Sequence, residues 1–189
     1  MSARRFFTAR RPVVRTVLGA IALLSAALSA TPALAKRAAP GEAAEIARCI
    51  RTAARGHDWL EKTLWGLRMQ EAGWLGAEVA NTNGTHDLGP LQIDSWWVPR
   101  IARLVGRPEP QVRFWLRHDA CFNAEVARWI FLSGLRMTGD YWAAVGAYHS
   151  PAGWRQRAYA AKVATHMRAR FGPRLFATDG AGRRDGINR

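Results

Sequence analysis

The chain has 189 residues and a formal net charge of +14, from 28 lysines and arginines against 14 aspartates and glutamates. This length is typical of one domain with short additions, and it is large enough for a hydrophobic core. Such a charge suggests an anionic partner such as nucleic acid, although an arginine-rich composition that favours solubility accounts for much of it.

Residues 1–35 have the order of a secretory signal peptide. Arginines with no acidic residue among them precede an apolar run over 17–30, and the small-residue pattern Ala-Leu-Ala follows at 33–35. Basic segment, apolar segment and small-residue cleavage site together indicate export. The run is shorter than the roughly 20 apolar residues of a membrane span, which leaves an uncleaved anchor as the alternative. We expect a mature chain that begins near Lys36 and resides in the periplasm.

Export narrows the choice of anionic partner. Subtracting the five arginines of residues 1–35 from +14 leaves +9 on residues 36–189. A nucleic-acid-binding protein rarely needs an export signal, so we expect no nucleic acid partner. An anionic polymer outside the inner membrane, such as a cell wall with peptide carboxylates, fits both the charge and the export signal.

The two cysteines, Cys49 and Cys121, both lie in the part expected to be exported. An even number of cysteines in an exported chain indicates a disulfide, and two free buried thiols are the alternative. Closing so long a loop would stabilise the fold by roughly 4 kcal/mol in the chain-entropy model.

Helical patterns dominate residues 36–171. Residues 36–46 are expected to form a linker and the start of the first helix, 47–171 the domain, and 172–189 a flexible tail rich in glycine and arginine. Aspartates are expected to cap three helices: Asp58, Asp119 and Asp140. The expected helices cover residues 42–55, 60–70, 111–116, 120–137, 141–150 and 154–171, with further helical patterns from Ser95 to about 105.

Residues 76–94, GAEVANTNGTHDLGPLQID, interrupt the helical patterns. Asn83-Gly84 is a strong turn signal, so this segment is expected to form a small β-hairpin or an irregular β loop. The sequence therefore predicts a mainly α single domain with one small β insertion, which follows the helix that leads to Glu71.

Glu71 is the acidic residue whose setting most suggests chemistry. It ends the predicted helix over 60–70, among apolar or large neighbours such as Trp65, Leu67 and Trp74. A carboxyl group in apolar surroundings shifts towards its neutral form, and a neutral carboxylic acid near pH 7 can donate a proton. The alternative is a salt bridge at the helix end, to Arg68 or another arginine.

Other catalytic patterns are weak or missing in the sequence. The five histidines are scattered and form no HExxH motif, so we expect no metal site and no cofactor. No serine lies in a G-x-S-x-G elbow, and no phosphate-binding glycine loop occurs. The chain has nine tryptophans, and aromatic faces can line a sugar-binding groove. Trp96 and Trp97 are the pair expected in such a groove, whereas most of the others are expected to pack in the core.

Several blocks of the sequence, taken in order, resemble lytic transglycosylases. They are Cys49, MQEAG ending at Gly73, and the segments NTNGTHDLGPLQIDSWW at 81–97, DACFN at 119–123 and WAAVGAYHS at 142–150. More narrowly, the chain is similar to the small exported enzymes associated with conjugation, pili and type III or IV secretion. The resemblance implies a lysozyme-like α domain that cuts peptidoglycan between N-acetylmuramic acid and N-acetylglucosamine, leaving a 1,6-anhydro end.

The same resemblance assigns roles to individual residues. Glu71 matches the catalytic glutamate, and the segment from Gly89 through Gln92 to Ile93 matches a loop whose glutamine contacts substrate. Tyr148 matches a tyrosine that lines the groove, and its neighbour His149 stands where the family has asparagine. Cys49 and Cys121 match two bridged cysteines of this subgroup.

Two further positions depart from the family, and Asp87 has two possible roles. Ala72 replaces a serine that helps to orient the glutamate, and Pro90 replaces a leucine and stiffens the loop. Asp87 either holds the turn through backbone N–H groups or touches substrate, with the structural role favoured. Trp96 is the tryptophan expected to contact the sugar.

These residues suggest a mechanism with one carboxyl group. Most glycosidases use two, about 5 to 9.5 Å apart, but no second acid has a comparable setting. Glu71 would serve as acid and then base, while the substrate supplies its 2-acetamido group and 6-hydroxyl. The alternatives are a muramidase that uses water and a non-catalytic wall-binding assembly factor. A monomer that acts on peptidoglycan strands, beside a cell-envelope secretion or pilus complex, is expected.

Overall fold

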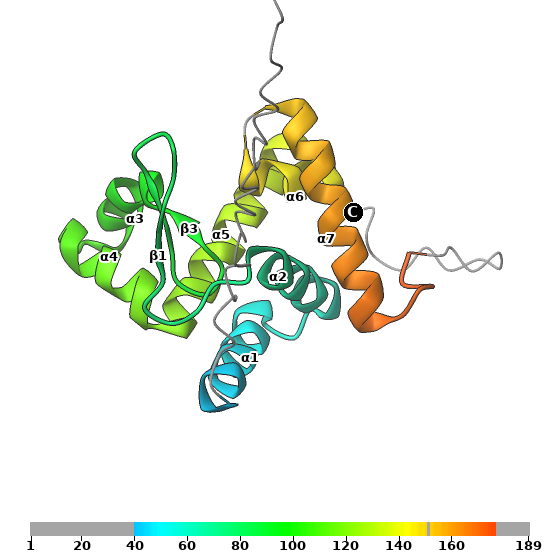
Figure 1. Cartoon of the computed structure of the whole chain (residues 1–189), viewed down its shortest axis with the longest axis horizontal. Helices are drawn as coiled ribbons and strands as arrows, with labels where there is room; N and C mark the ends of the chain where they lie inside the picture. Colours follow the sequence, from blue (N-terminus) through cyan, green and yellow to red (C-terminus); the bar gives the residue numbers. More distant parts are fainter. Residues whose placement is uncertain (1–39, 151, 177–189) are drawn as a thin grey trace, which may run out of the picture. The chain divides into compact units, whose positions relative to one another are not determined.

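The computed structural model describes residues 40–150 and 152–176 (Figure 1). The predicted signal peptide, most of the expected linker and the end of the expected tail lie outside the described residues. These features therefore stay predictions.

The described part of the chain is mainly α-helical, with a small antiparallel sheet in the order β1-β2-β3. This confirms the expected fold class, a lysozyme-like mainly α domain with a small β insertion after the helix that carries Glu71. The elements in chain order are α1 (Pro40–Ala54), α2 (Asp58–Glu71), β1 (Glu78–Ala80), β2 (His86–Leu88), β3 (Ile93–Asp94), the 3-10 helix η1 (Ser95–Trp97), α3 (Val98–Val105), α4 (Glu109–His118), α5 (Ala120–Thr138), α6 (Tyr141–His149) and α7 (Gly153–Phe171).

Two of the three predicted helix caps are present. The Asp119 carboxylate accepts the backbone N–H groups of Cys121 and Phe122, and Asp140 does the same for Ala143. These bonds pair N–H groups that the first turn of a helix leaves without partners. They explain why α5 and α6 begin where the sequence predicts.

The third predicted cap was wrong. Asp58 is the first residue of α2, and His57 precedes it in the cap position without a side-chain capping bond. The Asp58 carboxylate instead pairs with Lys62 one turn later, with 2.5 Å between the charged atoms. A negative charge in the first turn still stabilises the helix dipole.

The core is formed by contacts between consecutive helices and between helices that are distant in sequence. α5 contacts α1 and α6, α7 contacts α2 and α6, and α1 also contacts α2. In the view of Figure 1, α3, α4 and the strands lie on one side of α2, and α6 and α7 lie on the other. Leu64 and Leu67 of α2, Phe131 of α5 and Val163 of α7 are fully buried in this core.

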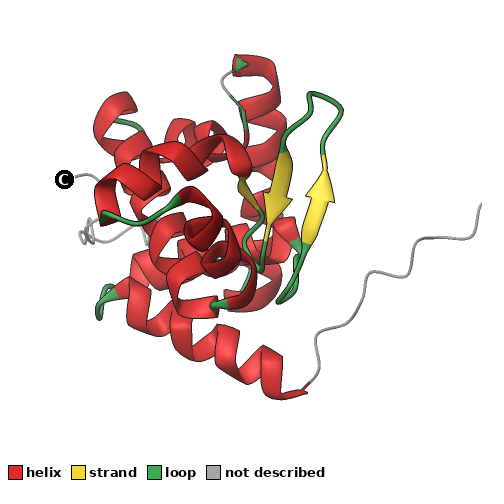
Figure 2. Ribbon diagram, turned by 90° about the vertical axis from the view of Figure 1, so that its left-hand side faces the viewer, coloured by secondary structure: helices red, strands yellow, loops and turns green. Residues whose placement is uncertain are grey.

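The β insertion is a three-stranded sheet, one strand more than the predicted hairpin. β1 pairs with β2 so that Val79 faces Asp87, and β2 pairs with β3 so that Leu88 faces Ile93. The predicted turn connects β1 and β2, where Gly84 adopts a left-handed φ of 84° that glycine tolerates. Figure 2 shows the strands at one side of the helices.

Asn123 of α5 fixes the β2–β3 loop to the helices. Its buried amide donates to the carbonyl oxygens of Leu88 and Leu116 at 2.9 and 2.8 Å. Its side-chain oxygen accepts the N–H of Leu91 at 2.9 Å. A buried amide that uses all these groups orders the loop, because leaving any of them without a partner would cost stability.

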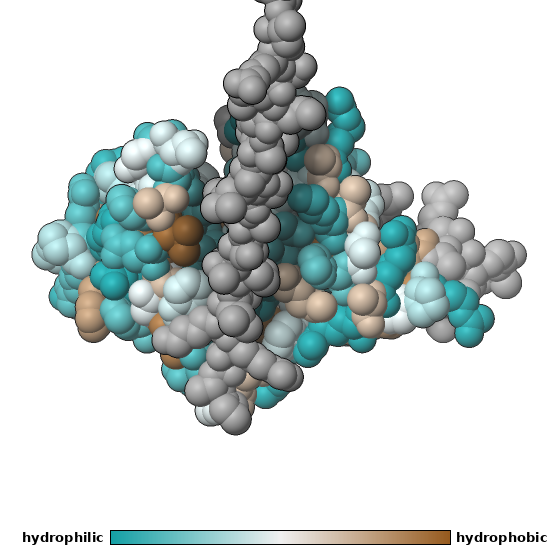
Figure 3. Space-filling model, in the orientation of Figure 1, coloured by the Kyte–Doolittle hydropathy of each residue, from teal (hydrophilic) through white to brown (hydrophobic). Residues whose placement is uncertain are grey.

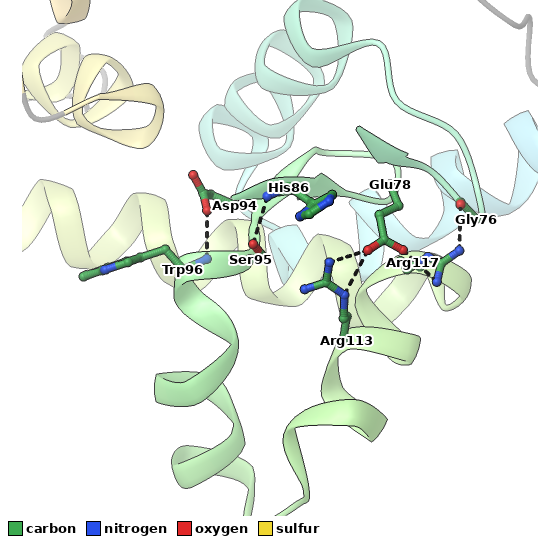
Figure 4. A network of polar contacts seen from close by, with 8 residues as sticks. All are labelled: Gly76, Glu78, His86, Asp94, Ser95, Trp96, Arg113 and Arg117. Atoms are coloured by element: carbon green, nitrogen blue, oxygen red, sulfur yellow. Dashed lines mark hydrogen bonds and ion pairs between the residues drawn. The ribbon is translucent and has the colours of Figure 1, made fainter. Parts of the chain in front are cut away.

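An ion cluster holds β1 against α4. Figure 4 shows Glu78 of β1 between Arg113 and Arg117 of α4. Glu78 pairs with both guanidinium groups, at 2.8 Å in the case of Arg117. The hydrogen bond from Arg113 is the main cause that lowers the pKa of Glu78. Glu78 is therefore a structural carboxylate.

The expected disulfide between Cys49 and Cys121 joins α1 to α5, with 4.5 Å between the two Cα atoms. Described residues on the face drawn in Figure 3 are mostly hydrophilic, and apolar residues appear there in small patches. Of the helices within 40–150 and 152–176, none is both long and apolar enough to cross a membrane.

Candidate active site

Most of the predicted site residues line one cavity of about 380 Å³. The end of α2, the β insertion, α5, the end of α6 and the start of α7 contribute to its wall. The lining residues are Glu71, Ala80, Asn81, Thr82, Asn83, Asp87, Gln92, Ile93, Asp94, Trp97, Ile130, Tyr148, His149, Ser150 and Arg155. A larger cavity of about 730 Å³ lies between α6 and α7 and contains none of the predicted site residues.

Glu71 is the last residue of α2, and the chain turns sharply after it. Ala72 ends the helix in the left-handed conformation, with φ 51°. Gly73 then passes so close to the β2–β3 loop that a Cβ atom would lie 2.2 Å from the carbonyl oxygen of Gly89. Only glycine permits this approach, and it brings the Glu71 end of α2 against the β insertion.

A hydrogen bond from Tyr159 holds the Glu71 carboxyl group. The Tyr159 hydroxyl donates to Oε1 of Glu71. Burial raises the pKa of Glu71 to about 7, the Tyr159 hydrogen bond acts in the opposite direction, and the charge of Asp87 raises the pKa further. A carboxyl group with a pKa near 7 can donate and accept a proton at neutral pH, which is what a general acid and base requires.

The alternative of a helix-end salt bridge does not hold in the described part of the chain. No arginine there pairs with Glu71, whereas Arg68 interacts with the charge of Glu42. The Glu42 carboxylate also accepts the N–H of Leu75 at 2.7 Å. Arg68, the arginine nearest to Glu71 in sequence, therefore interacts with a residue of α1 and is not among those that line the cavity.

Sequence reasoning missed Tyr159. This residue is buried on the inner side of α7, where Val163 and Met167 follow at helical spacing. Such a position is typical of a core residue, but a buried tyrosine hydroxyl needs a hydrogen-bond partner. That requirement was the one available signal, and it could not identify the partner, which is 88 residues away. Burial, together with the charge of Glu71, raises the pKa of Tyr159 well above its ordinary value, so the hydroxyl stays a donor.

Asp87 of β2 faces the same cavity as Glu71. Its carboxylate accepts a hydrogen bond from the Asn81 side chain at 3.0 Å. Burial raises the pKa of Asp87, and the charge of Asp94 adds to the effect. Asp94 itself caps η1 by accepting the N–H of Trp96 at 2.8 Å. Asp87 thus both braces the β1–β2 turn and exposes an acid to the cavity.

The segment from Gly89 to Ile93 shapes the cavity wall. Gln92 has a left-handed φ of 49° and donates its side-chain amide to the carbonyl oxygen of Gly89 at 2.7 Å. Gly89 does not line the cavity; its φ is 70°, and a Cβ atom would lie 2.0 Å from the carbonyl oxygen of Leu116. Its role is to let the loop pass close to α4. Ile93 forms a buried apolar part of the wall.

Tyr148 and His149 contribute the end of α6. The Tyr148 hydroxyl donates to the carbonyl oxygen of Leu91 at 3.0 Å and so fixes the β2–β3 loop. The His149 ring stacks on the Tyr159 ring, with 4.7 Å between centroids and 4° between planes. Partial burial is the main cause that lowers the pKa of His149, which favours the neutral ring beside Glu71.

The two neighbouring tryptophans differ in placement. Trp97 lines the cavity and packs edge-on against Trp129, with 5.5 Å between ring centroids. Trp96 is 64% exposed and is not among the lining residues, although its ring contacts Trp97 at 4.9 Å between centroids. Trp97 is therefore the better-placed aromatic for a ligand inside the cavity, and Trp96 is available only outside it.

The geometry defines a protein class in outline: a lysozyme-like α domain whose cavity presents a carboxyl group with a raised pKa. No group of three or more His, Cys, Asp or Glu side chains in the described residues is arranged to hold a metal ion.

Comparison with known proteins adds a distant relative. No protein-family model matches the chain. Over 88 residues it is 33% identical to Invasion protein IagB of Salmonella typhimurium, in strains SL1344 and LT2, and of Salmonella typhi. The match covers 46% of this chain and 52% of the relative, so the chain spans about half the length of the curated relatives that it matches.

Proposed function

We propose that this protein is a peptidoglycan lytic transglycosylase, which cleaves the bond between N-acetylmuramic acid and N-acetylglucosamine and leaves a 1,6-anhydro end. The observation that carries this proposal is the Glu71 carboxyl group, which has a pKa of about 7 and is held by Tyr159 in a cavity lined with amides. The distant homology to an invasion protein supports it.

In the first step, protonated Glu71 gives its proton to the oxygen of the glycosidic bond. The bond between that oxygen and the anomeric carbon breaks, and the N-acetylglucosamine side leaves with a hydroxyl group. The substrate's own 2-acetamido oxygen stabilises the positive charge on the anomeric carbon. Asn81 and Gln92 suit an acetamido group, because each has a side-chain carbonyl oxygen that can accept the acetamido N–H.

In the second step, ionised Glu71 takes the proton from the 6-hydroxyl of the muramic acid residue. The 6-oxygen attacks the anomeric carbon and closes the anhydro ring, and Glu71 returns to its protonated state. No water is consumed. Tyr159 suits both steps, since its hydroxyl donates to whichever form of the carboxyl group is present.

Asp87 favours a second candidate, a muramidase. This acid lines the same cavity as Glu71, and the two charges influence each other. A second carboxylate could act as nucleophile or activate water, as in glycosidases that use two acids. We favour the transglycosylase because Asp87 accepts a hydrogen bond from Asn81 and has a raised pKa, which suits a brace better than a nucleophile.

The cellular setting belongs to the same proposal. An export signal at residues 1–35 would place the enzyme in the periplasm, where peptidoglycan lies. Local opening of the wall for a secretion, conjugation or pilus apparatus fits the homology to a protein that is named for invasion. We expect the enzyme to act as a monomer.

Release of dye from labelled cell-wall sacculi tests the proposed activity. The wild-type protein should release soluble fragments, and Glu71→Gln should release none, because the amide cannot give up a proton. Tyr141→Phe is the matched control, since its hydroxyl bonds to Thr63 and does not face the cavity. Equal release by wild type and Glu71→Gln would rule out this assignment.

A further inference from the structure

The cavity that contains Glu71 is lined by more acidic than basic side chains. Its lining includes three acidic side chains, those of Glu71, Asp87 and Asp94, and a single arginine, Arg155. In their ionised forms these acids repel an anionic ligand, and the neutral amides do not attract it through charge. Among the described lining residues, Arg155 is thus the one permanently charged group that can attract an anion.

Arg155 is free to bind a ligand. It lies in the first turn of α7 and is exposed. Its guanidinium carbon lies 5.1 Å from the centre of the Trp154 ring. No carboxylate of the described residues pairs with it, in contrast to Arg113, which pairs with Glu78. Stacking on an aromatic ring holds a flat guanidinium in place and leaves its N–H edge available.

Arg155 is linked to Glu71 through His149 and Tyr159. Its positive charge acts on His149, whose ring stacks on Tyr159. Tyr159 in turn donates to Glu71. Because Arg155 and Glu71 line the same cavity, an anion bound by Arg155 would lie in the cavity that holds the catalytic carboxyl group and would influence which part of a glycan strand enters it.

We propose that Arg155 binds a carboxylate on the substrate and so selects glycan strands that carry acidic substituents. This inference rests on the proposed function. In the wall polymer a carboxylate has two sources: the stem peptide attached to muramic acid, or the lactyl group that is freed when the peptide is removed. A chitin-type chain offers the same acetamido groups and no carboxylate, so it separates recognition of charge from recognition of sugar.

The test uses protein expressed from the full-length sequence and three ligands: peptide-bearing glycan strands, the same strands after removal of their peptides, and chitohexaose. Binding is measured in the Glu71→Gln background, which needs no turnover, and cleavage is measured with intact Glu71. The variants are Arg155→Gln, Arg155→Lys and Arg157→Gln. Arg157 is the matched control, because it is exposed on the same helix but lines the other cavity.

We expect Arg155→Gln to weaken binding of at least one carboxylate-bearing strand by about tenfold, the usual scale for a hydrogen-bonded charge pair. Chitohexaose binding should not change, and Arg157→Gln should match the parent protein on all three ligands. Arg155→Lys should restore part of the loss, because it keeps the charge without the forked geometry. Loss confined to peptide-bearing strands identifies the stem peptide as the source, and loss confined to peptide-free strands identifies the lactyl group.

Two results overturn the inference: no loss of binding on any ligand, or an equal loss on chitohexaose, which would mean that Arg155 only shapes the cavity. The proposed reaction fails separately. If the wild type cleaves no strand while the carboxylate-dependent binding persists, the transglycosylase proposal is rejected and the role of Arg155 stands. If the Glu71→Gln protein binds none of the three ligands, the inference about Arg155 is rejected, and wild-type cleavage alone decides the transglycosylase proposal.

Discussion

Glu71 and Tyr159 form the residue pair on which the proposed chemistry depends. Removing the hydroxyl in Tyr159→Phe removes the hydrogen bond that lowers the pKa of Glu71, so this pKa should rise above about 7. Cleavage that needs protonated Glu71 falls as pH rises through its pKa, and this fall should therefore move to higher pH. The maximal rate should drop about tenfold, because one hydrogen bond that orients the carboxyl group is lost.

The measurement is the cleavage rate of peptidoglycan strands as a function of pH. Tyr141→Phe is again the control, since it removes the same hydroxyl outside the cavity. A merely structural role for Tyr159 would lower the rate equally at every pH. An unshifted profile would thus contradict the role given to this hydrogen bond.

Burial of Glu71 also makes the free energy of unfolding depend on pH. Its pKa is raised from 4.5 to about 7, so the folded state holds the proton more tightly than the unfolded state. The stability that this gives is fully present below pH 4.5, declines as pH rises, and is lost above about 7. At pH 8 the loss amounts to at most about 3 kcal/mol, before screening by solvent.

Glu71→Gln should therefore be more stable than the wild type at pH 8 and nearly equal to it at pH 4. The amide can still accept the Tyr159 hydrogen bond, and it carries no charge to be buried. Urea denaturation at the two pH values measures the difference. Glu109→Gln, on the exposed face of α4, controls for a general effect of removing one negative charge. If Glu71→Gln is destabilised at pH 8, the carboxyl group is not held as described.

At the scale of elements, the β2–β3 loop depends on Asn123. Asn123→Ala removes three hydrogen bonds to Leu88, Leu91 and Leu116 and should lower the free energy of unfolding by about 3 kcal/mol. Activity should fall further than stability explains, because the loop carries Gln92 into the cavity. Urea denaturation and strand cleavage are measured together, with Gln111→Ala on α4 as control. Full activity in a folded Asn123→Ala protein would contradict this.

Elements that depend on local signals were predictable from sequence. Asp119 and Asp140 cap their helices because a capping bond spans only a few residues, and the Asn83-Gly84 turn follows from the backbone preference of glycine. The cap predicted at Asp58 was wrong because an aspartate can either cap a helix or stabilise its first turn. The sequence does not distinguish these two positions. The third strand, at Ile93, was not expected, since two residues are too few to give an alternating pattern.

The site was only partly predictable, for a reason of the same kind. Glu71 could be selected because its apolar neighbours are adjacent in sequence. Tyr159 and Arg155 could not be placed beside it, because α7 meets α2 only through tertiary packing. Trp96 and Trp97 could be selected only as a pair, because which of two adjacent side chains faces the cavity depends on where η1 begins.

At the scale of the whole molecule, the disulfide between Cys49 and Cys121 ties α1 to α5, across 72 positions of sequence. Reduction should lower the free energy of unfolding by about 4 kcal/mol, because the unfolded chain gains loop entropy. Denaturation with and without reductant measures this, and Cys49→Ala with Cys121→Ala should reproduce the reduced protein. A difference near zero would mean that the bridge contributes little to the fold.

The most direct test of the central claim is the chemical nature of the ends that the enzyme leaves. Purified peptidoglycan is digested by the wild-type protein and by Glu71→Gln, and the released muropeptides are analysed by mass spectrometry. The proposal predicts products that end in 1,6-anhydro-muramic acid, one water lighter than hydrolysis products, and their disappearance with Glu71→Gln. Reducing ends would contradict the transglycosylase in favour of the muramidase, and binding to the wall without any release would contradict catalysis altogether.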